Sequence, residues 1–296
     1  MDIEAFLAAH RLPRSYVRAV EQVHIPLAAS IYKKCVADRM MVIGICGAQG
    51  SGKSTMVLVV QSLLQDRGLS CVAMSLDDLY LTRAERKMLA KRVHPLLATR
   101  GVPGTHDIEL GLETIRALRR AQLVPIPAFD KAIDDRRPKS DWPRVRGPAQ
   151  VLLLEGWCVG ARPQDEADLQ APQNDLEREH DADAVWRRYA NEALRGPYRR
   201  LFDELDALVL LQAPGFEVVR RWRTEQERKL RERVSIGSPS RITRRVMSDE
   251  EIARFIAHYE RLTRHILAEM PERADALVRL SEEREPLEFI VRGKLA

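Results

Sequence analysis

The chain has 296 residues, of which 45% are hydrophobic and 31% charged, and its formal net charge at pH 7 is +5. This balance suits one large α/β domain with appended helices, and no apolar run is long enough to span a bilayer. Basic residues are spread along the chain and aromatic residues make up only 5%, whereas nucleic-acid proteins more often gather a basic face interleaved with exposed aromatics. We therefore expect neither a nucleic-acid partner nor a membrane partner.

The start of the chain and its cysteines favour a cytoplasmic protein. Residues 1–5 lack the basic-then-apolar layout of a secretory signal. The cysteines form no C-x-x-C pair, and Cys46 and Cys71 fall inside expected buried strands, as small apolar core residues do in a reducing compartment. A structural zinc is therefore not expected. The cysteines are Cys35, Cys46, Cys71 and Cys158.

The predicted elements begin with a helical extension over residues 1–38, where apolar residues recur every three to four positions and Pro26 is expected to break or kink the helix. Strands and helices then alternate. The expected strands are 41–46, 69–76, 150–154, 207–211 and 276–280. The expected helices are 53–66, 108–120, 184–203 with an interruption at Pro197, 214–233 and 248–269.

The pattern predicts an α/β fold with a parallel sheet and helices on both faces, in one domain over residues 1–296. The strands are near-continuous apolar runs, as a parallel sheet covered on both faces requires, and their alternation with helices favours the same architecture. Residues 161–183 are rich in Asp, Glu, Gln and Pro, which predicts a weakly ordered surface insertion. The tail 284–296 carries no clear signal.

The pattern G-x-x-x-x-G-K-S at residues 47–54 follows an apolar strand and opens a helix, which is the context of a phosphate-binding loop (P-loop). Its backbone N–H groups and the helix N-terminus attract phosphate oxygens. Lys53 would reach the β- and γ-phosphates of ATP, and the Ser54 hydroxyl would bind Mg²⁺. A glycine-rich turn without a ligand is the alternative. The residues expected to bind the nucleotide are Gly47, Gln49, Gly50, Ser51, Gly52, Lys53, Ser54 and Thr55.

Acidic residues follow two other expected strands, where ligands bind in open α/β sheets. Glu155 is the candidate Mg²⁺ ligand, because magnesium keeps several waters and takes few protein ligands. Asp77 and Asp78 are adjacent, so one can face the site while the other faces the protein. A hydroxyl that accepts a phosphoryl group needs a carboxylate to orient it and take its proton. The alternatives are a turn-capping role for Glu155 and a turn or helix N-cap role for either aspartate.

These residues together resemble the phosphoribulokinase, uridine kinase and pantothenate kinase superfamily of P-loop kinases, a likeness that covers residues 38–272. Further stretches are similar to the plant-type D-glycerate 3-kinase family. They are Ser75–Leu81, Arg100–Asp107, Pro127–Lys131, Glu155–Gly160 and Met247–Glu251. Departures from that family at Phe129, at 132–137 and at 259–263 bear on the acceptor and not on the phosphoryl donor.

The resemblance implies transfer of the γ-phosphate of ATP to the 3-hydroxyl of D-glycerate, giving 3-phosphoglycerate, with Asp77 as the base and Lys53 as a catalytic residue. It also implies that one segment closes over a small anionic acceptor, whose carboxylate an arginine can bind bidentately. The acceptor-binding residues would be Asp78, Tyr80, Arg100, Thr105, His106, Asp107, Asp130, Lys131 and Arg136, with Arg137 as an alternative to Arg136.

The basic helix at 214–233 is placed like the lid of the superfamily. There arginines neutralise charge on the transferring phosphoryl group, which would make Arg223 catalytic and Arg220 a nucleotide contact. An exposed charged helix with internal ion pairs is the alternative.

Other functions remain possible from the sequence. Another acceptor, such as pantothenate or a nucleoside, is an alternative within the kinases. A regulatory GTP switch is disfavoured because the chain has no Asn-Lys-x-Asp segment, and a nucleotide-binding subunit without turnover would not need Asp77. The sequence leaves the oligomeric state open.

Overall fold

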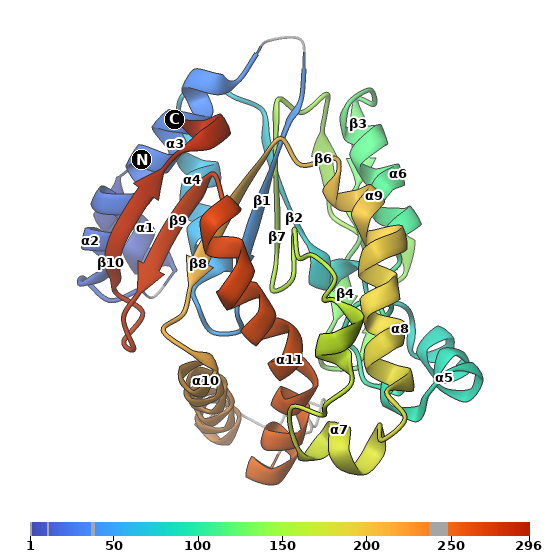
Figure 1. The fold of residues 1–296 in the computed structure, drawn as a ribbon. Helices are drawn as coiled ribbons and strands as arrows, with labels where there is room; N and C mark the ends of the chain where they lie inside the picture. Colours follow the sequence, from blue (N-terminus) through green and yellow to red (C-terminus); the bar gives the residue numbers. More distant parts are fainter. Residues whose placement is uncertain (1, 11, 37–38, 237–247) are drawn as a thin grey trace.

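The computed structural model describes residues 2–10, 12–36, 39–236 and 248–296, arranged around one six-stranded sheet (Figure 1). Met247, the first residue of the expected motif 247–251, lies outside these ranges. The spatial order of the strands is β10-β9-β8-β1-β7-β2. Their bounds are β1 Met41–Gly47, β2 Cys71–Ser75, β7 Val151–Gly156, β8 Ala207–Gln212, β9 Ala276–Leu280 and β10 Pro286–Val291.

Five strands of this sheet run parallel, and β10 pairs antiparallel with β9. All five parallel strands coincide with predicted ones, so the predicted parallel α/β sheet is confirmed. The strand β10 was not predicted, and it lies wholly within the tail 284–296, which carries no clear sequence signal. It also missed two small antiparallel pairs. These are β3 (Leu123–Pro125) with β6 (Arg144–Arg146), and β4 (Phe129–Asp130) with β5 (Asp135–Arg136).

Helices cover both faces of the sheet (Figure 1), because alternate strand residues point to two separate cores. Val42 and Leu154 belong to the core with α6, α9 and most of α11, whereas Ile43 and Leu153 belong to the core with α3, α4 and α10. The covering helices are α3 Ile25–Lys34, α4 Lys53–Gln65, α6 Ile108–Leu118, α9 Arg199–Phe202, α10 Phe216–Ile236 and α11 Asp249–Arg273.

Shorter elements connect these layers. They are α1 Ile3–Ala9, α2 Tyr16–Ala19, η2 Leu76–Leu79, α5 Arg83–Arg92, η3 Pro95–Ala98, η4 Lys139–Asp141, η5 Glu166–Leu169, α7 Asp175–His180, α8 Val185–Ala193 and η7 Gly293–Leu295. Within the described ranges, no helix combines the length and the apolarity that crossing a bilayer requires.

Two of the prolines in helical runs, Pro26 and Pro197, lie next to or within π-helical turns. The turn Val20–His24 precedes Pro26, and α3 continues beyond that proline. Pro197 lies within the turn Leu194–Tyr198, between α8 and α9. A wider helical turn tolerates a residue that lacks the N–H donor. The expected break at Pro26 is therefore replaced by a π-helical turn, and the expected interruption at Pro197 takes the same form.

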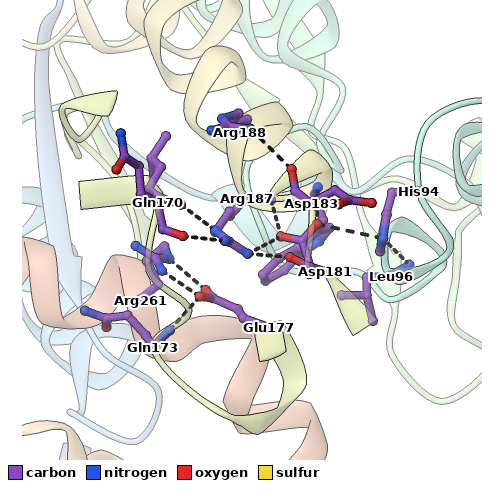
Figure 2. A network of polar contacts seen from close by, with 12 residues as sticks. His94, Leu96, Gln170, Gln173, Glu177, Asp181, Asp183, Arg187, Arg188 and Arg261 are labelled. Carbon is purple, nitrogen blue, oxygen red and sulfur yellow. Dashed lines mark hydrogen bonds and ion pairs between the residues drawn. The ribbon is translucent and has the colours of Figure 1, made fainter. Parts of the chain in front are cut away.

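Residues 161–183 are ordered by buried ion pairs, so the predicted weak order is wrong (Figure 2). Glu177 is completely buried, and its carboxylate accepts from Nε and Nη2 of Arg261 at 2.7 and 2.6 Å. Asp181 is buried as well and accepts from Nη1 of Arg187 at 3.0 Å. Polar composition misled the prediction because these charges satisfy one another inside the fold.

Candidate active site

The P-loop joins β1 to α4 through backbone turns that glycine allows. Gly50 and Gly52 have φ angles of +82° and +88°, in the left-handed region that favours glycine. Lys53 is the first residue of α4, so the loop ends at a helix N-terminus whose free N–H groups and dipole favour an anion. Gly47 closes β1, and Gln49 and Thr55 are half-buried in the same stretch.

Glu155 lies beside the P-loop because β7 pairs with β1 in register. Ser54 Oγ donates to Glu155 Oε1 at 3.0 Å, and Lys53 Nζ lies 3.8 Å from Oε2. Glu155 is buried, and Oε2 has no hydrogen-bond partner among the described residues. A buried carboxylate with an unfilled acceptor beside a hydroxyl suits a hard cation that prefers oxygen ligands. The residues present therefore fit Mg²⁺.

The two adjacent aspartates face different partners in the turn η2 after β2. Tyr80 Oη donates to Asp77 Oδ1 at 2.8 Å, and Lys131 Nζ donates to Oδ2 at 2.6 Å. Burial alone would raise the pKa of the Asp77 carboxyl, but the charges of Lys131 and Lys53 outweigh it and hold that pKa well below its ordinary range. Asp77 is therefore ionised at neutral pH and near enough to Lys53 to feel its charge.

Asp78 turns into the protein, where its Oδ1 accepts from the backbone N–H of Phe129 at 3.0 Å. Burial raises the pKa of this carboxyl to about 6, against the lowering effect of that hydrogen bond. Asp78 thus ties η2 to β4, the strand that leads to Lys131. This contact gives Asp78 a structural partner and supplies no evidence for the expected role in acceptor binding.

His106 is a neutral, buried side chain next to this aspartate pair. Its ring stacks on Tyr80 with centroids 4.5 Å apart, and burial lowers the pKa of the imidazole to about 3. Tyr198 Oη accepts from the Gly104 N–H at 3.0 Å and contacts His106 Nδ1. If the Tyr198 hydroxyl donates to Nδ1, the neutral imidazole carries its hydrogen on Nε2, and this tautomer is an assignment from the hydrogen-bond partners. That Nε2 is buried without a partner in the described part of the chain.

Other expected acceptor residues are engaged in contacts within the protein. The Thr105 hydroxyl donates to the Val102 carbonyl at 2.7 Å and accepts from the Gly101 N–H at 3.0 Å, with no exposed surface. The Thr105 hydroxyl is thus hydrogen-bonded within its own turn, and its expected contact with the acceptor stays a prediction. Asp130 Oδ1 accepts from the Ala132 N–H at 2.8 Å and forms a tight turn beside Lys131.

The expected arginines are held by carboxylates and carbonyls. Arg100 forms an ion pair with Asp134, a residue with a φ angle of +56°. Burial alone would lower the pKa of Arg100, but Asp134 outweighs it and raises that pKa. Arg136 Nη2 donates to the Tyr80 carbonyl at 3.0 Å and to Asp107 Oδ2 at 3.1 Å.

Asp107 is the N-cap of α6, where its Oδ1 accepts from the Leu110 N–H at 3.1 Å. Both of its oxygens are therefore occupied, because Oδ2 accepts from Arg136. Asp107 and Arg136 thus hold the loop that precedes α6, and the structure gives no direct support to Asp107 as an acceptor contact.

The helix α10 meets the P-loop through a tryptophan. A Cβ atom built on Gly50 would lie 2.8 Å from Trp222 Cβ, and Trp222 is almost fully buried. Arg220 is exposed and lines a cavity of about 570 Å³ between α7, α10 and α11. Residues two apart on a helix point about 200° apart, so Arg220 and Trp222 lie on different sides of α10, and the expected nucleotide contact of Arg220 stays a prediction.

Arg223 points toward α11, where its guanidinium lies 5.5 Å from the centroid of the Phe255 ring. Its charge also lowers the pKa of Tyr259, a pKa that burial raises above its ordinary value. Tyr259 Oη in turn donates to the Arg100 carbonyl at 3.1 Å. Arg223 therefore belongs to the group of side chains around the loop at 100–107.

Three side chains at the site had not been expected there. They are Tyr198, Tyr259 and Arg284, whose Nε donates to the Gly50 carbonyl at 2.9 Å. Each reaches the site from a distant element, and no local motif marks it. A left-handed φ at Arg284 marks it in the structure but has no signature in the sequence.

The family model described as "Phosphoribulokinase / Uridine kinase family" matches residues 42–162. An uncharacterised kinase, mug58, of Schizosaccharomyces pombe is 34% identical over 231 residues, which are 75% of this chain and 79% of the relative. The chloroplastic D-glycerate 3-kinase of Arabidopsis thaliana is 29% identical over 83% of this chain, but the match spans only 54% of the plant protein.

Among solved structures, a D-glycerate 3-kinase from Cryptococcus neoformans has the same fold. Its TM-score is 0.74 at 24% identity, and the match covers 92% of this chain and 99% of that one. The P-loop, the sheet order and these likenesses define an ATP-dependent small-molecule kinase. The chain belongs to the phosphoribulokinase/uridine kinase family.

Proposed function

We propose that this kinase transfers the γ-phosphate of ATP, in the presence of Mg²⁺, to the 3-hydroxyl of D-glycerate and so forms 3-phosphoglycerate. The observation that carries the proposal is the ionised Asp77 carboxylate, which Tyr80 and Lys131 hold beside the P-loop lysine. The plant relative and the fungal structural neighbour are both D-glycerate 3-kinases, which supports this acceptor.

The P-loop residues and Glu155 have separate tasks in this proposal. Backbone N–H groups of the loop and Lys53 bind the phosphates, and Ser54 with Glu155 would hold Mg²⁺. When bound, the metal ion neutralises charge on the transferring phosphoryl group. Asp77 orients the acceptor hydroxyl and takes its proton as the oxygen attacks. Arg223 supplies a further positive charge from α10.

The acceptor is recognised as a small anion with hydroxyl groups. Lys131 offers an ammonium next to Asp77, and the partnerless Nε2–H of His106 offers a neutral donor. A neutral imidazole donor can bind a hydroxyl or carboxylate oxygen without adding charge. Arg100 and Arg136 shape this pocket through their own carboxylate partners.

A coupled assay of ADP release tests the proposal with D-glycerate, L-glycerate, pantothenate and nucleosides as acceptors. We expect the highest kcat/KM with D-glycerate. Another preferred acceptor, or ADP release that does not depend on any acceptor, would contradict the proposal.

The variant Asp77→Asn tests the assigned base. We expect kcat with D-glycerate to fall by roughly 10²-fold or more, while ATP affinity measured by calorimetry stays unchanged. The matched control is Asp141→Asn, which changes an exposed aspartate on η4 and should leave both values unaltered. Full turnover in Asp77→Asn would remove Asp77 from this role.

A further inference from the structure

The turn between β9 and β10 reaches the P-loop through one arginine. Arg284 Nε donates to the Gly50 carbonyl at 2.9 Å, although the two residues are 234 positions apart in the chain. Its Nη2 pairs with Glu225 of α10 at 2.6 Å, and its guanidinium lies 5.3 Å from the centroid of the Trp222 ring. One side chain thus joins the P-loop, α10 and the hairpin.

The backbone of Arg284 adopts an uncommon conformation. Its φ angle is +70°, and within the described ranges only two other non-glycine residues, Asp134 and Ala184, have a positive φ. Ser281 holds the turn, because its Oγ accepts from the N–H groups of Glu283 and Glu285 at 3.1 and 3.2 Å. Left-handed backbone at a non-glycine residue is disfavoured and persists where surrounding contacts require it.

The second contact of Gly50 comes from α10. Trp222 packs against the Gly50 backbone, and its Nε1 donates to the Glu282 carbonyl at 2.6 Å. The peptide of Gly50 is therefore enclosed between the hairpin and α10. Glycine has more conformational freedom than any other residue because it lacks a Cβ atom, and Gly50 adopts a φ angle of +82°. The contacts with Arg284 and Trp222 therefore fix the orientation of its peptide.

The orientation of that peptide matters for an anion. A carbonyl oxygen directed into a phosphate-binding loop would repel phosphate oxygens, whereas N–H groups attract them. The Gly50 carbonyl oxygen accepts from Arg284 and therefore points toward the hairpin formed by β9 and β10. We propose that Arg284 is a positioning residue for the P-loop, which keeps the Gly50 carbonyl away from the bound phosphates and makes triphosphate affinity depend on the hairpin. This inference rests on the nucleotide use in the proposed function and not on the acceptor.

Isothermal titration of ATP and ADP into the full-length protein and its variants tests the inference. Arg284→Met removes the hydrogen bond and the charge, and we expect its affinity for both nucleotides to fall at least tenfold. In turnover, KM for ATP should rise while KM for the acceptor stays within twofold. The matched control is Arg279→Met on β9, which removes an exposed ion pair with Glu288 on β10 and should bind both nucleotides normally.

Arg284→Lys keeps a cation for Glu225 but cannot serve both partners with one planar group. We expect an intermediate loss of at least threefold, which also decides the matter if Arg284→Met does not fold. Wild-type affinity in Arg284→Lys, or in folded Arg284→Met, would overturn the inference, including the case in which only thermal stability falls. If wild-type protein binds ATP but does not phosphorylate D-glycerate, the acceptor proposal fails and the role of Arg284 is still decided by the titrations.

Discussion

Asp77 shows how single neighbours set the chemistry of a residue. Its low pKa depends on Lys131, whose side chain is 59% exposed and therefore replaceable without opening the core. A carboxylate beside one cation typically has its pKa lowered by about 1–3 units. In Lys131→Met we therefore expect the acidic limb of the kcat/KM profile to move up by about one pH unit. The measurement is a pH–rate profile that extends down to pH 2, because the depressed pKa of Asp77 places the acidic limb below pH 4.

The direction of this shift follows from the base role. Asp77 must be ionised to accept a proton, so activity is lost as pH falls through its pKa, and a higher pKa moves that loss to higher pH. Lys131→Arg keeps the positive charge and should keep the wild-type limb. A profile for Lys131→Met that overlays the wild type would show that Asp77 is not the titrating base.

The proximity of side chains was predictable from the sequence where a local motif dictates the backbone. Lys53, Ser54 and Glu155 come together because a P-loop and the end of the neighbouring parallel strand must share one edge of the sheet. The Thr105 hydroxyl is hydrogen-bonded within its own turn, and Arg284 contacts Gly50 although the two are 234 positions apart in the chain. Neither fact has a local signature, because both depend on partners that only the tertiary structure selects.

Among the secondary-structure elements, α11 is connected to residues 161–183 by the buried ion pair of Arg261 and Glu177 (Figure 2). Removing one partner of a buried ion pair leaves an uncompensated charge and costs about 3–5 kcal/mol. We expect Arg261→Met to lower the free energy of unfolding by that amount in urea titrations. Because α11 also carries Tyr259 at the acceptor loop, KM for the acceptor should rise as well.

The double variant Arg261→Met with Glu177→Gln separates the pair from the packing around it. Because no charge is then left unpaired, its free energy of unfolding should lie at least about 1 kcal/mol above that of Arg261→Met alone. Strictly additive losses would contradict a coupled buried pair. Arg188→Met, which removes an exposed pair with Glu166, is the control and should change stability by less than about 1 kcal/mol.

The elements themselves were predictable to different degrees. The five parallel strands appear as apolar runs because both of their faces are buried. β10 is an edge strand with the burial pattern of a half-exposed one, and β4 and β5 have two residues each, too few for a period to emerge. The ordered structure of residues 161–183 could not be predicted from composition, because composition gives the number of charged residues but not which of them form ion pairs.

The whole molecule carries buried neutral histidines in three separate regions. Burial lowers the pKa of His24 in the N-terminal turn to about 4, that of His106 to about 3 and that of His258 on α11 to about 4. Unfolded histidine titrates near 6.5, so the unfolded chain takes up protons below that pH while the folded chain does not. These groups stabilise the fold above pH 6.5, and that stabilisation is lost progressively as pH falls toward their folded pKa values.

Asp78 acts in the opposite sense, because its raised pKa of about 6 lets the folded protein take up a proton before the unfolded chain does. Burial also lowers the pKa of His265, which adds to the effect of these three imidazoles. Near pH 5, the imidazoles against one carboxyl leave a net uptake of at least about two protons on unfolding. The free energy of unfolding should therefore fall by about 3 kcal/mol per pH unit on acidification, as urea titrations at pH 7, 6 and 5 can measure.

His24→Phe should reduce this slope by about 1.4 kcal/mol per unit, whereas His180→Gln, at an exposed position, should not. An unchanged slope in His24→Phe would mean that His24 does not resist protonation in the folded protein.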